Sequence, residues 1–271
     1  MNPVEILRGD GPVVLGMPHT GTHVPAGIVD NLNDNGRMLA DTDWHVDQLY
    51  GGLLPGATIV RATFHRYVID ANRDPSGKSL YPGQNTTGLC PLTDFDNWPI
   101  WREGRAPDET EIARRLRDFH APYHAALAAE LERVRACHGV VVLYDCHSIR
   151  SVVPHLFEGT LPDFNIGTND GTTCAPEIEA DVAAICMAES DCRTVVNGRF
   201  KGGWTTRHYG RPEAGVQAIQ MELAQSTHLV AERAPFAYDE GKAAQIRRPL
   251  GVILAALEDR ARAHQTTGGT R

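Results

Sequence analysis

The stretch VVVLYDCHS, residues 140–148, decides the fold that is predicted for this 271-residue chain. Apolar and aromatic residues run from Val140 to Tyr144 after Gly139, and polar or small residues follow them. Short apolar runs between turn residues are typical of strands buried in a parallel sheet. Ligands of open α/β sheets bind at the carboxyl ends of the strands. The stretch therefore predicts a central strand with functional side chains, His147 among them, at its end.

Similar strand patterns recur along the chain and alternate with helical patterns. VVLGM at 13–17 is a second buried run, and it ends at PHTG, 18–21. Apolar spacing of three to four residues predicts helices. Further strands are predicted at 58–63, 66–70, 193–196 and 216–223, and helices at 43–54, 108–136, 177–189 and 243–263. The alternation predicts an α/β fold with three layers, α/β/α, around a mixed, mostly parallel sheet.

Length and composition limit the function classes. One domain over residues 1–264, followed by a disordered tail at 265–271, is expected for this length. The formal net charge of −8 argues against proteins that bind nucleic acid or anionic membranes, because these present a basic face. No run approaches the roughly 20 apolar residues of a spanning helix, and the first ten residues lack a secretory signal. We therefore expect a cytoplasmic protein whose six scattered cysteines are reduced.

Histidines follow two of the predicted strands, His19 after the first and His147 after the central one. Catalytic zinc takes three protein ligands from His, Asp and Glu and leaves one position for water. A histidine pair at equivalent strand ends therefore predicts a site for Zn²⁺ or another divalent metal. Asp43 is the predicted third ligand, and His23 and His45 are the alternatives.

Asn72 and Arg73 follow another predicted strand. The planar, permanently charged guanidinium of arginine matches a carboxylate, so this pair predicts binding of a small anionic substrate. A structural salt bridge from Arg73 to Asp70 or Asp74 is the alternative. The segment 74–101 is rich in Pro, Gly, Asn and Thr and has no period. Long loops of this kind commonly cover a site.

Glu222 lies within the predicted strand 216–223 and is flanked by apolar residues. A carboxylate there is costly unless it is paired or functional, so Glu222 is predicted to be a general base. Arg207 belongs to a Gly- and Arg-rich segment, 198–215, that is expected to be a loop. It is predicted to hold a second carboxylate or to stabilise an oxyanion. An ion pair of Glu222 with Arg207 or Arg211 is the structural alternative.

Cys146 is a candidate nucleophile by its position beside His147. Adjacent residues on a strand point to opposite faces, so the two side chains should not face one site. We therefore predict that Cys146 is a core residue. The sequence contains no Gly-x-Ser-x-Gly, Gly-x-Gly-x-x-Gly or P-loop motif.

Six motifs, taken in order over about residues 13–225, resemble those of the N-formylglutamate amidohydrolase family. They are PHTG (18–21), DTD (41–43), DANR (70–73), DCHS (145–148), KGG (201–203) and QME (220–222). The resemblance implies hydrolysis of N-formyl-L-glutamate to formate and L-glutamate, the last step of one route of histidine degradation. It also implies a fold like that of the zinc carboxypeptidases and aspartoacylases. Those relatives place an Asn-Arg pair on a substrate carboxylate and use a Glu as the base. The resemblance therefore implies these roles for Asn72, Arg73 and Glu222.

One departure from these relatives concerns the metal ligands. Zinc carboxypeptidases and aspartoacylases use His-x-x-Glu for two ligands, whereas Thr22 stands three residues after His19 here. The second protein ligand is therefore expected elsewhere, at Asp43. Three other classes stay open from the sequence. One is a zinc hydrolase of the same fold that acts on another N-acyl amino acid or a peptide, and another is a binding module that keeps only the fold. The third is a cysteine hydrolase that uses Cys146.

Overall fold

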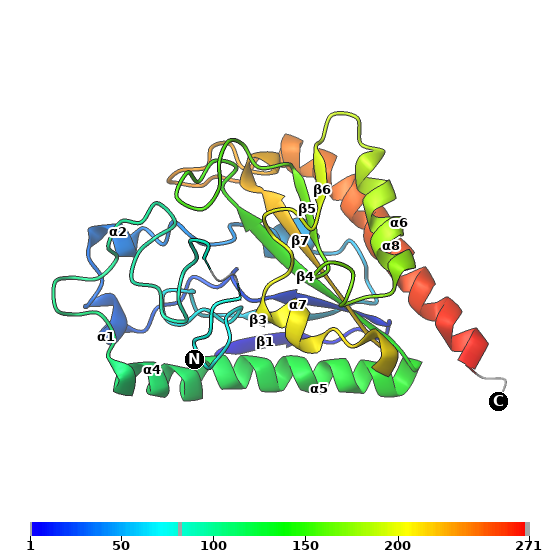
Figure 1. Cartoon of the computed structure of the whole chain (residues 1–271), viewed down its shortest axis with the longest axis horizontal. Helices are drawn as coiled ribbons and strands as arrows, with labels where there is room; N and C mark the ends of the chain where they lie inside the picture. The colour runs from blue at the N-terminus through cyan, green and yellow to red at the C-terminus, as the bar shows by residue number, and fades with distance from the viewer. Residues whose placement is uncertain (1, 81–82, 269–271) are drawn as a thin grey trace.

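One sheet forms the centre of the molecule (Figure 1). The computed structural model describes residues 2–80 and 83–268, and seven strands in these ranges lie in the order β1-β3-β2-β4-β7-β5-β6. They are β1 (Val4–Leu7), β2 (Val13–Met17), β3 (Thr58–Ala62), β4 (Val141–Ile149), β5 (Phe164–Gly167), β6 (Thr194–Val196) and β7 (Val216–Ala224). Neighbouring strands are parallel except for β1 with β3 and β5 with β7. The predicted mixed, mostly parallel sheet is confirmed.

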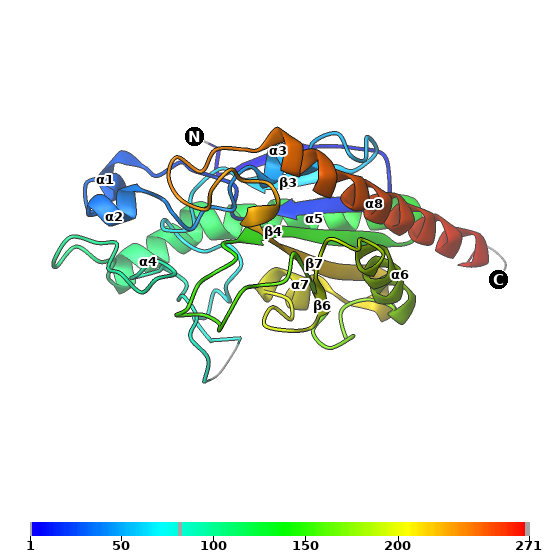
Figure 2. The same ribbon diagram turned by 90° about the horizontal axis from the view of Figure 1, so that it is seen from above.

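Helices cover both faces of the sheet and make the predicted three layers. α5 (Ala121–His138) lies along one face, and α6 (Pro176–Met187) and α8 (Glu240–Gly268) lie along the other (Figures 1 and 2). The other helical elements are α1 (Ala26–Val29), α2 (Asp34–Arg37), α3 (Val46–Tyr50), α4 (Glu109–Arg115), α7 (Trp204–Tyr209), a π-helical turn (Leu116–His120) and two 3₁₀ turns (Pro212–Ala214 and Gln225–Thr227).

Successive residues of the central strand β4 point into two different cores. Tyr144 and Cys146 pack in the core that contains α6 and α8, whereas Val141 and Leu143 pack in the core that contains α5. A strand buried on both faces needs apolar residues at every position, which explains the continuous run in the sequence. All nine residues of β4 are buried. The strand continues through His147, which therefore lies within β4 and not, as expected, in the loop after it.

The long helical stretch predicted at 108–136 is observed as α4, the π-helical turn and α5 in succession. It starts where the side chain of Asp108 accepts a 2.8 Å hydrogen bond from the backbone N–H of Glu111. It ends at Gly139, whose φ of 74° is the left-handed conformation that closes many helices. Asp108 and Gly139 therefore set the two ends of this helical stretch.

Residues 66–70 form no strand, contrary to the prediction. Tyr67, Val68 and Ile69 are buried, but they pack in the core beside α4 and α5 without joining the sheet. The buried guanidinium of Arg115 donates hydrogen bonds to the carbonyls of Tyr67 (3.4 Å) and Val68 (2.9 Å). Buried carbonyls outside a sheet need such partners. A side chain distant in the sequence thus supplies the bonds that a neighbouring strand would supply.

The segment 198–215, predicted to be a loop, contains α7 and the 3₁₀ turn Pro212–Ala214. Helices as short as α7 depend on tertiary packing more than on propensity. Trp204 supplies that packing, since its ring stacks on His208 at 4.2 Å and meets the edge of His124 in α5 at 4.6 Å.

The last helix, α8, runs to Gly268, and the final residues of the predicted tail (265–271), 269–271, lie outside the described residues. The division into one domain over 1–264 and a tail stays a prediction. Within the described ranges, no helix combines the length and the hydropathy needed to cross a bilayer. The six cysteines are free, as expected for reduced thiols.

Candidate active site

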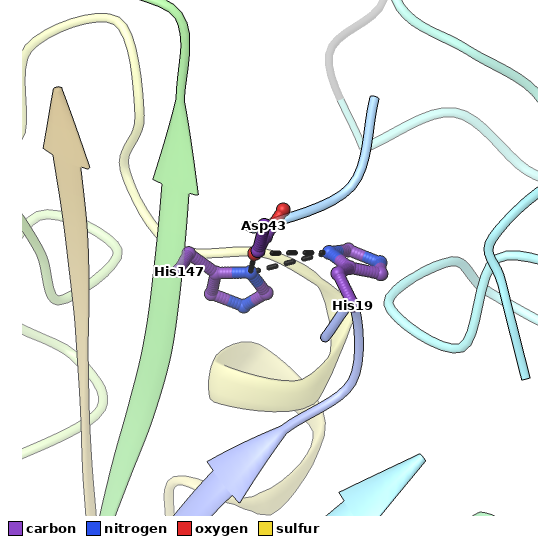
Figure 3. A group of neighbouring side chains, drawn as sticks. All are labelled: His19, Asp43 and His147. Carbon is purple, nitrogen blue, oxygen red and sulfur yellow. Dashed lines mark hydrogen bonds and ion pairs between the residues drawn. The ribbon is translucent and has the colours of Figure 1, made fainter. Parts of the chain in front are cut away.

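Two histidines and an aspartate meet at the carboxyl edge of the sheet (Figure 3). His19 follows β2, and His147 lies near the end of the neighbouring parallel strand β4. Asp43 precedes α3, and its backbone N–H donates to the carbonyl of His19 at 3.1 Å. That hydrogen bond ties the Asp43 segment to the edge of the sheet. The structure therefore brings together the three residues predicted as metal ligands.

The three ligand atoms are close enough to hold one cation. His147 Nδ1 lies 3.2 Å from His19 Nδ1 and 3.1 Å from Asp43 Oδ2. His19 Nδ1 lies 3.7 Å from Asp43 Oδ2. In a tetrahedral zinc site with ligand bonds of about 2 Å, neighbouring ligand atoms are about 3.3 Å apart. All three residues are buried, so their spacing and environment fit a metal centre.

Hydrogen bonding fixes which nitrogen of His19 faces this centre. His19 Nε2–H donates to Asp70 Oδ1 at 2.7 Å, which leaves a lone pair on Nδ1. That lone pair and the Asp43 carboxylate both face His147 Nδ1, so the space between them requires positive charge. Burial would lower the pKa of His147, but Asp145 and Asp43 outweigh burial and raise this pKa well above its ordinary value. In the metal-free protein a proton on His147 supplies this positive charge, and a divalent cation competes with the proton for the same position.

Asp43 also has a buried cationic partner. Arg66 Nη2 donates to Asp43 Oδ1 at 2.8 Å, and the Arg66 guanidinium lies 5.0 Å from the centre of the Phe95 ring. Burial alone would raise the pKa of Asp43, but the charges around it, the Arg66 guanidinium foremost, hold this pKa below its ordinary value. Asp43 is therefore ionised at neutral pH, as a carboxylate ligand of a metal must be.

Glu222 lies beside His147 on the neighbouring strand, because β4 and β7 pair in parallel with these two residues in register. Its side chain is buried and accepts a 3.4 Å hydrogen bond from Gln220 Nε2. Burial raises the pKa of Glu222 to about 8, although His147 opposes the shift. A carboxyl group that titrates near neutrality can both accept and return a proton, which suits a general base.

A cavity of about 610 Å³, which includes space open to solvent, lies over this centre. Its lining combines the polar centre with cationic, hydroxyl and apolar side chains: His19, Arg66, Asn72, Arg73, Thr86, Thr87, Phe95, His147, Ser148, Ile149, Leu156, Arg199, Phe200, Gly203, Gln220 and Glu222. Among the described residues of this lining, three are arginines, which suits an anionic ligand. The segment 74–101 contributes Thr86, Thr87 and Phe95, so it covers the site as predicted.

Asn72 is held by two hydrogen bonds, one made by its backbone and one by its side chain. Its N–H donates to Asp70 Oδ1 at 2.8 Å, and its side-chain oxygen accepts the N–H of Thr205 at 2.8 Å. This arrangement places Asn72 Nδ2 at 3.1 Å from His147 Nε2. A Cβ atom at Gly203 would lie 2.2 Å from Asn72 Nδ2. The close approach explains why the KGG motif ends in glycine.

Arg73 lines the cavity next to Asn72 and is fixed by several contacts. Its guanidinium donates to the carbonyl (2.9 Å) and the hydroxyl (2.8 Å) of Thr87 and lies 3.7 Å from Asp70. Behind it, His120 Nε2 bonds the Arg73 carbonyl at 3.0 Å. The ion pair between Arg73 and Asp70, which was the alternative to substrate binding, is therefore present, and Arg73 also lines the cavity.

Arg207 is not among the described residues that line the cavity. Its guanidinium donates to the carbonyl of Gly202 at 2.8 Å and to that of Leu80 at 3.4 Å. Arg211, the other proposed partner of Glu222, donates to the Arg207 carbonyl at 2.9 Å. The structure therefore ties Arg207 to the Lys201–Gly203 motif and to Leu80.

The alternatives to Asp43 as third ligand lie elsewhere. His45 Nε2 is 2.9 Å from the carbonyl of Phe236. His23 lines a separate surface hollow together with Thr22. Neither histidine belongs to the cluster of ligand atoms formed by His19, Asp43 and His147.

Cys146 faces away from the site, as predicted. It is fully buried in the core beside α6 and α8. Burial raises the pKa of its thiol well above the ordinary value, so the thiolate needed for nucleophilic attack is disfavoured.

Arg66, Asp145 and Arg199 are additional residues of the site that the sequence patterns do not single out. Asp145 Oδ1 lies 3.2 Å from His147 Nε2, and its position two residues before His147 on one strand is a usable signal. Arg66 sits in the stretch assigned to a strand, and Arg199 in one assigned to a loop. Their charges become meaningful only once the fold brings them to the cavity.

A mostly parallel α/β sheet with this centre at its carboxyl edge defines the class of protein, an α/β protein with a candidate metal centre at the edge where such sheets bind their ligands. The sequence profile of the family described as N-formylglutamate amidohydrolase matches residues 11–229. The chain belongs to the N-formylglutamate amidohydrolase family, as its motifs predict.

Individual relatives agree with this assignment. The chain is 47% identical over 255 residues to N-formylglutamate deformylase of Pseudomonas aeruginosa, which covers 94% of this chain and 95% of that protein. It is 44% identical over 251 residues to the Pseudomonas putida protein of the same name, with 92% and 93% covered. The crystal structure of N-formylglutamate amidohydrolase from Ralstonia eutropha JMP134 superposes with a TM-score of 0.80 at 27% identity, covering 97% of this chain and 100% of that chain.

Proposed function

We propose that the chain hydrolyses N-formyl-L-glutamate to formate and L-glutamate at a divalent metal centre made by His19, Asp43 and His147. The observation that carries the proposal is the convergence of three ligand atoms and a buried glutamate under a cation-rich cavity. Relatives that bear the name N-formylglutamate deformylase support the choice of substrate.

The charge balance at the centre supports a bound cation. Four buried acids gather there: Asp43, Asp70, Asp145 and Glu222. Arg66 is the buried guanidinium paired with them, and the partly buried Arg73 lies at 3.7 Å from Asp70. Several buried carboxylates are costly without matching positive charge, which a divalent cation would supply. Two imidazole nitrogens and a carboxylate oxygen are ligands that zinc accepts, so Zn²⁺ is our first choice.

A divalent cation bound there would supply Lewis acidity, polarising the formyl carbonyl and lowering the pKa of a water molecule. The side chains of the protein provide the remaining functions. Glu222 accepts a proton from the attacking water and returns it to the nitrogen of the leaving amine. The guanidinium of Arg66 lines the same part of the cavity and stabilises negative charge on the carbonyl oxygen.

Asn72 and Arg73 hold one carboxylate of this small anionic substrate. The sequence predicts that Arg207 holds the second carboxylate or stabilises the oxyanion. In the structure its guanidinium bonds the carbonyls of Gly202 and Leu80, so that role stays a prediction. The expected cytoplasmic location also stays a prediction.

A substrate panel separates the proposed activity from an acylase with another N-acyl amino acid or peptide. We expect kcat/KM for N-formyl-L-glutamate to exceed that for N-acetyl-L-glutamate and N-formyl-L-aspartate by at least about 10-fold, since each differs by one carbon in a shaped site. Formate and acetate release by the metal-loaded protein measures this. Faster release of acetate would replace the proposal with an acetyl-amino-acid hydrolase, and a binding module would release neither acid.

A further inference from the structure

The cavity contains more positive charge than the reacting centre accounts for. Arg66 is bonded to Asp43 at 2.8 Å, and Arg73 lies 3.7 Å from Asp70, which in turn bonds a predicted metal ligand. Arg199 is the third arginine among the described residues of the lining. Its contacts connect it to a different part of the wall, so it requires a separate explanation.

We propose that Arg199 binds the side-chain carboxylate of the substrate and selects glutamate-type dianions over their neutral analogues. This assignment rests on the proposed function and adds a second anion subsite to it. N-formyl-L-glutamate carries two carboxylates at neutral pH. Asn72 and Arg73 account for one of them, and a second buried carboxylate needs a cationic partner of its own.

Two backbone carbonyls and an aromatic ring orient the guanidinium of Arg199. Its Nε donates to the carbonyl of Leu156 at 2.9 Å, and its Nη2 donates to the carbonyl of Asn85 at 2.8 Å. The guanidinium lies 5.3 Å from the centre of the ring of Phe200, which itself lines the cavity. These contacts hold the planar fork at the cavity wall. A fork oriented in advance binds a carboxylate with less loss of side-chain entropy.

Arg199 and Arg73 bond the two ends of the segment 85–87. Arg199 bonds the carbonyl of Asn85, whereas Arg73 bonds both the carbonyl and the hydroxyl of Thr87. Thr86 and Thr87 line the cavity between them. Two guanidiniums at the two ends of one short cavity-lining segment match a ligand with a carboxylate at each end.

The contacts of Arg199 suit the carboxylate farther from the formyl group. Its wall includes Leu156 and Phe200, and Phe200 packs against Phe157 at 6.0 Å between ring centres. Arg73, by contrast, is linked through Asp70 to His19. The substrate would therefore place its formyl end at the polar centre and its side chain toward Arg199.

Selectivity between N-formyl-L-glutamate and N-formyl-L-glutamine tests the assignment, because the two differ only in the charge of the distal group. In the wild-type protein we expect kcat/KM to favour the glutamate compound by at least about 100-fold. In Arg199→Met this ratio should fall below about 5, with the value for the glutamine compound changed by less than about 5-fold. Arg199→Lys, which keeps the charge without the fork, should recover part of the ratio.

Two comparison variants make the test specific. Arg193→Met removes another arginine that bonds backbone carbonyls, those of Thr160 and Leu161, outside the cavity lining, and its ratio should stay at the wild-type value. Arg207→Met tests the rival assignment. An unchanged ratio in Arg199→Met, an equal loss for both substrates, or a collapse of the ratio in Arg207→Met would each overturn the proposal.

A binding measurement keeps this test apart from failure of the proposed function. If the wild-type protein releases no formate from either compound, the proposed function fails. Calorimetric titration with L-glutamate and L-glutamine then still decides the role of Arg199. A preference for L-glutamate that disappears in Arg199→Met supports the subsite, and equal binding of both amino acids by the wild type contradicts it.

Discussion

Replacing Glu222 with glutamine should lower kcat for formate release by about 100- to 10,000-fold, the usual contribution of a general base. Glutamine has nearly the same shape and can accept the hydrogen bond from Gln220, but it cannot take up the proton of water. Because Glu222 contributes no atom to the cluster of ligand atoms from His19, Asp43 and His147, the metal content of the variant should stay near the wild-type value. Steady-state kinetics and elemental analysis of the same preparation measure both quantities.

The stability of this variant provides an internal check. Burial raises the pKa of Glu222 to about 8, so the ionised carboxylate is disfavoured in the fold and a neutral amide should not lower the unfolding temperature. Glu213→Gln is the matched control, since Glu213 is an exposed carboxylate just before the same strand. A kcat of Glu222→Gln within a factor of three of the wild type, with metal bound, would remove Glu222 from the mechanism.

Asp43→Asn should lose both metal and stability. The carboxylate offers one oxygen to the metal position and the other to Arg66, so the amide removes a charged ligand and leaves a buried guanidinium without its counter-charge. Breaking one partner of a buried pair costs about 3–5 kcal/mol. Metal affinity should fall by more than the roughly 10- to 100-fold that loss of an outer-shell partner costs. Urea unfolding of the metal-free proteins and zinc titration measure the two effects separately.

Two further variants distinguish the lost ligand from the unpaired charge. In Asp43→Asn combined with Arg66→Met, the free energy of unfolding should recover while zinc affinity stays low. Asp41→Asn is the control for a buried aspartate outside the trio, and burial already raises the pKa of Asp41 to about 7. It should keep its zinc affinity. Wild-type zinc affinity in Asp43→Asn would exclude Asp43 as a ligand and return attention to His23 or His45.

The sequence predicts the centre of this fold well because local patterns and global burial agree there. The run at 140–144 is apolar or aromatic at every position since β4 contributes to both cores, and the polar residues that follow it, 145–148, lie at the sheet edge. The same holds for the run at 13–17 and its neighbour His19. Asp43 also joins the site, where its backbone N–H bonds the carbonyl of His19 and its carboxylate bonds His147 and Arg66.

Features that depend on contacts between distant segments could not be predicted in this way. The apolar stretch 66–70 resembles a strand, but Arg115, far along the chain, satisfies its carbonyls. Arg199 and Arg207 both belong to the Gly- and Arg-rich segment 198–215. Only the folded chain shows that Arg199 lines the cavity, whereas Arg207, which bonds Gly202, is not among the described residues that line it. Short elements such as β1 and β5 carry too few residues to show a period.

The central claim is that His19, Asp43 and His147 hold a metal on which cleavage of N-formyl-L-glutamate depends. The most direct measurement is formate release by the purified protein before chelation, after removal of metal, and after addition of one equivalent of Zn²⁺. We predict that chelation abolishes formate release and that Zn²⁺ restores it in the wild type but not in Asp43→Asn. Full formate release by protein shown by elemental analysis to be free of metal would contradict the claim.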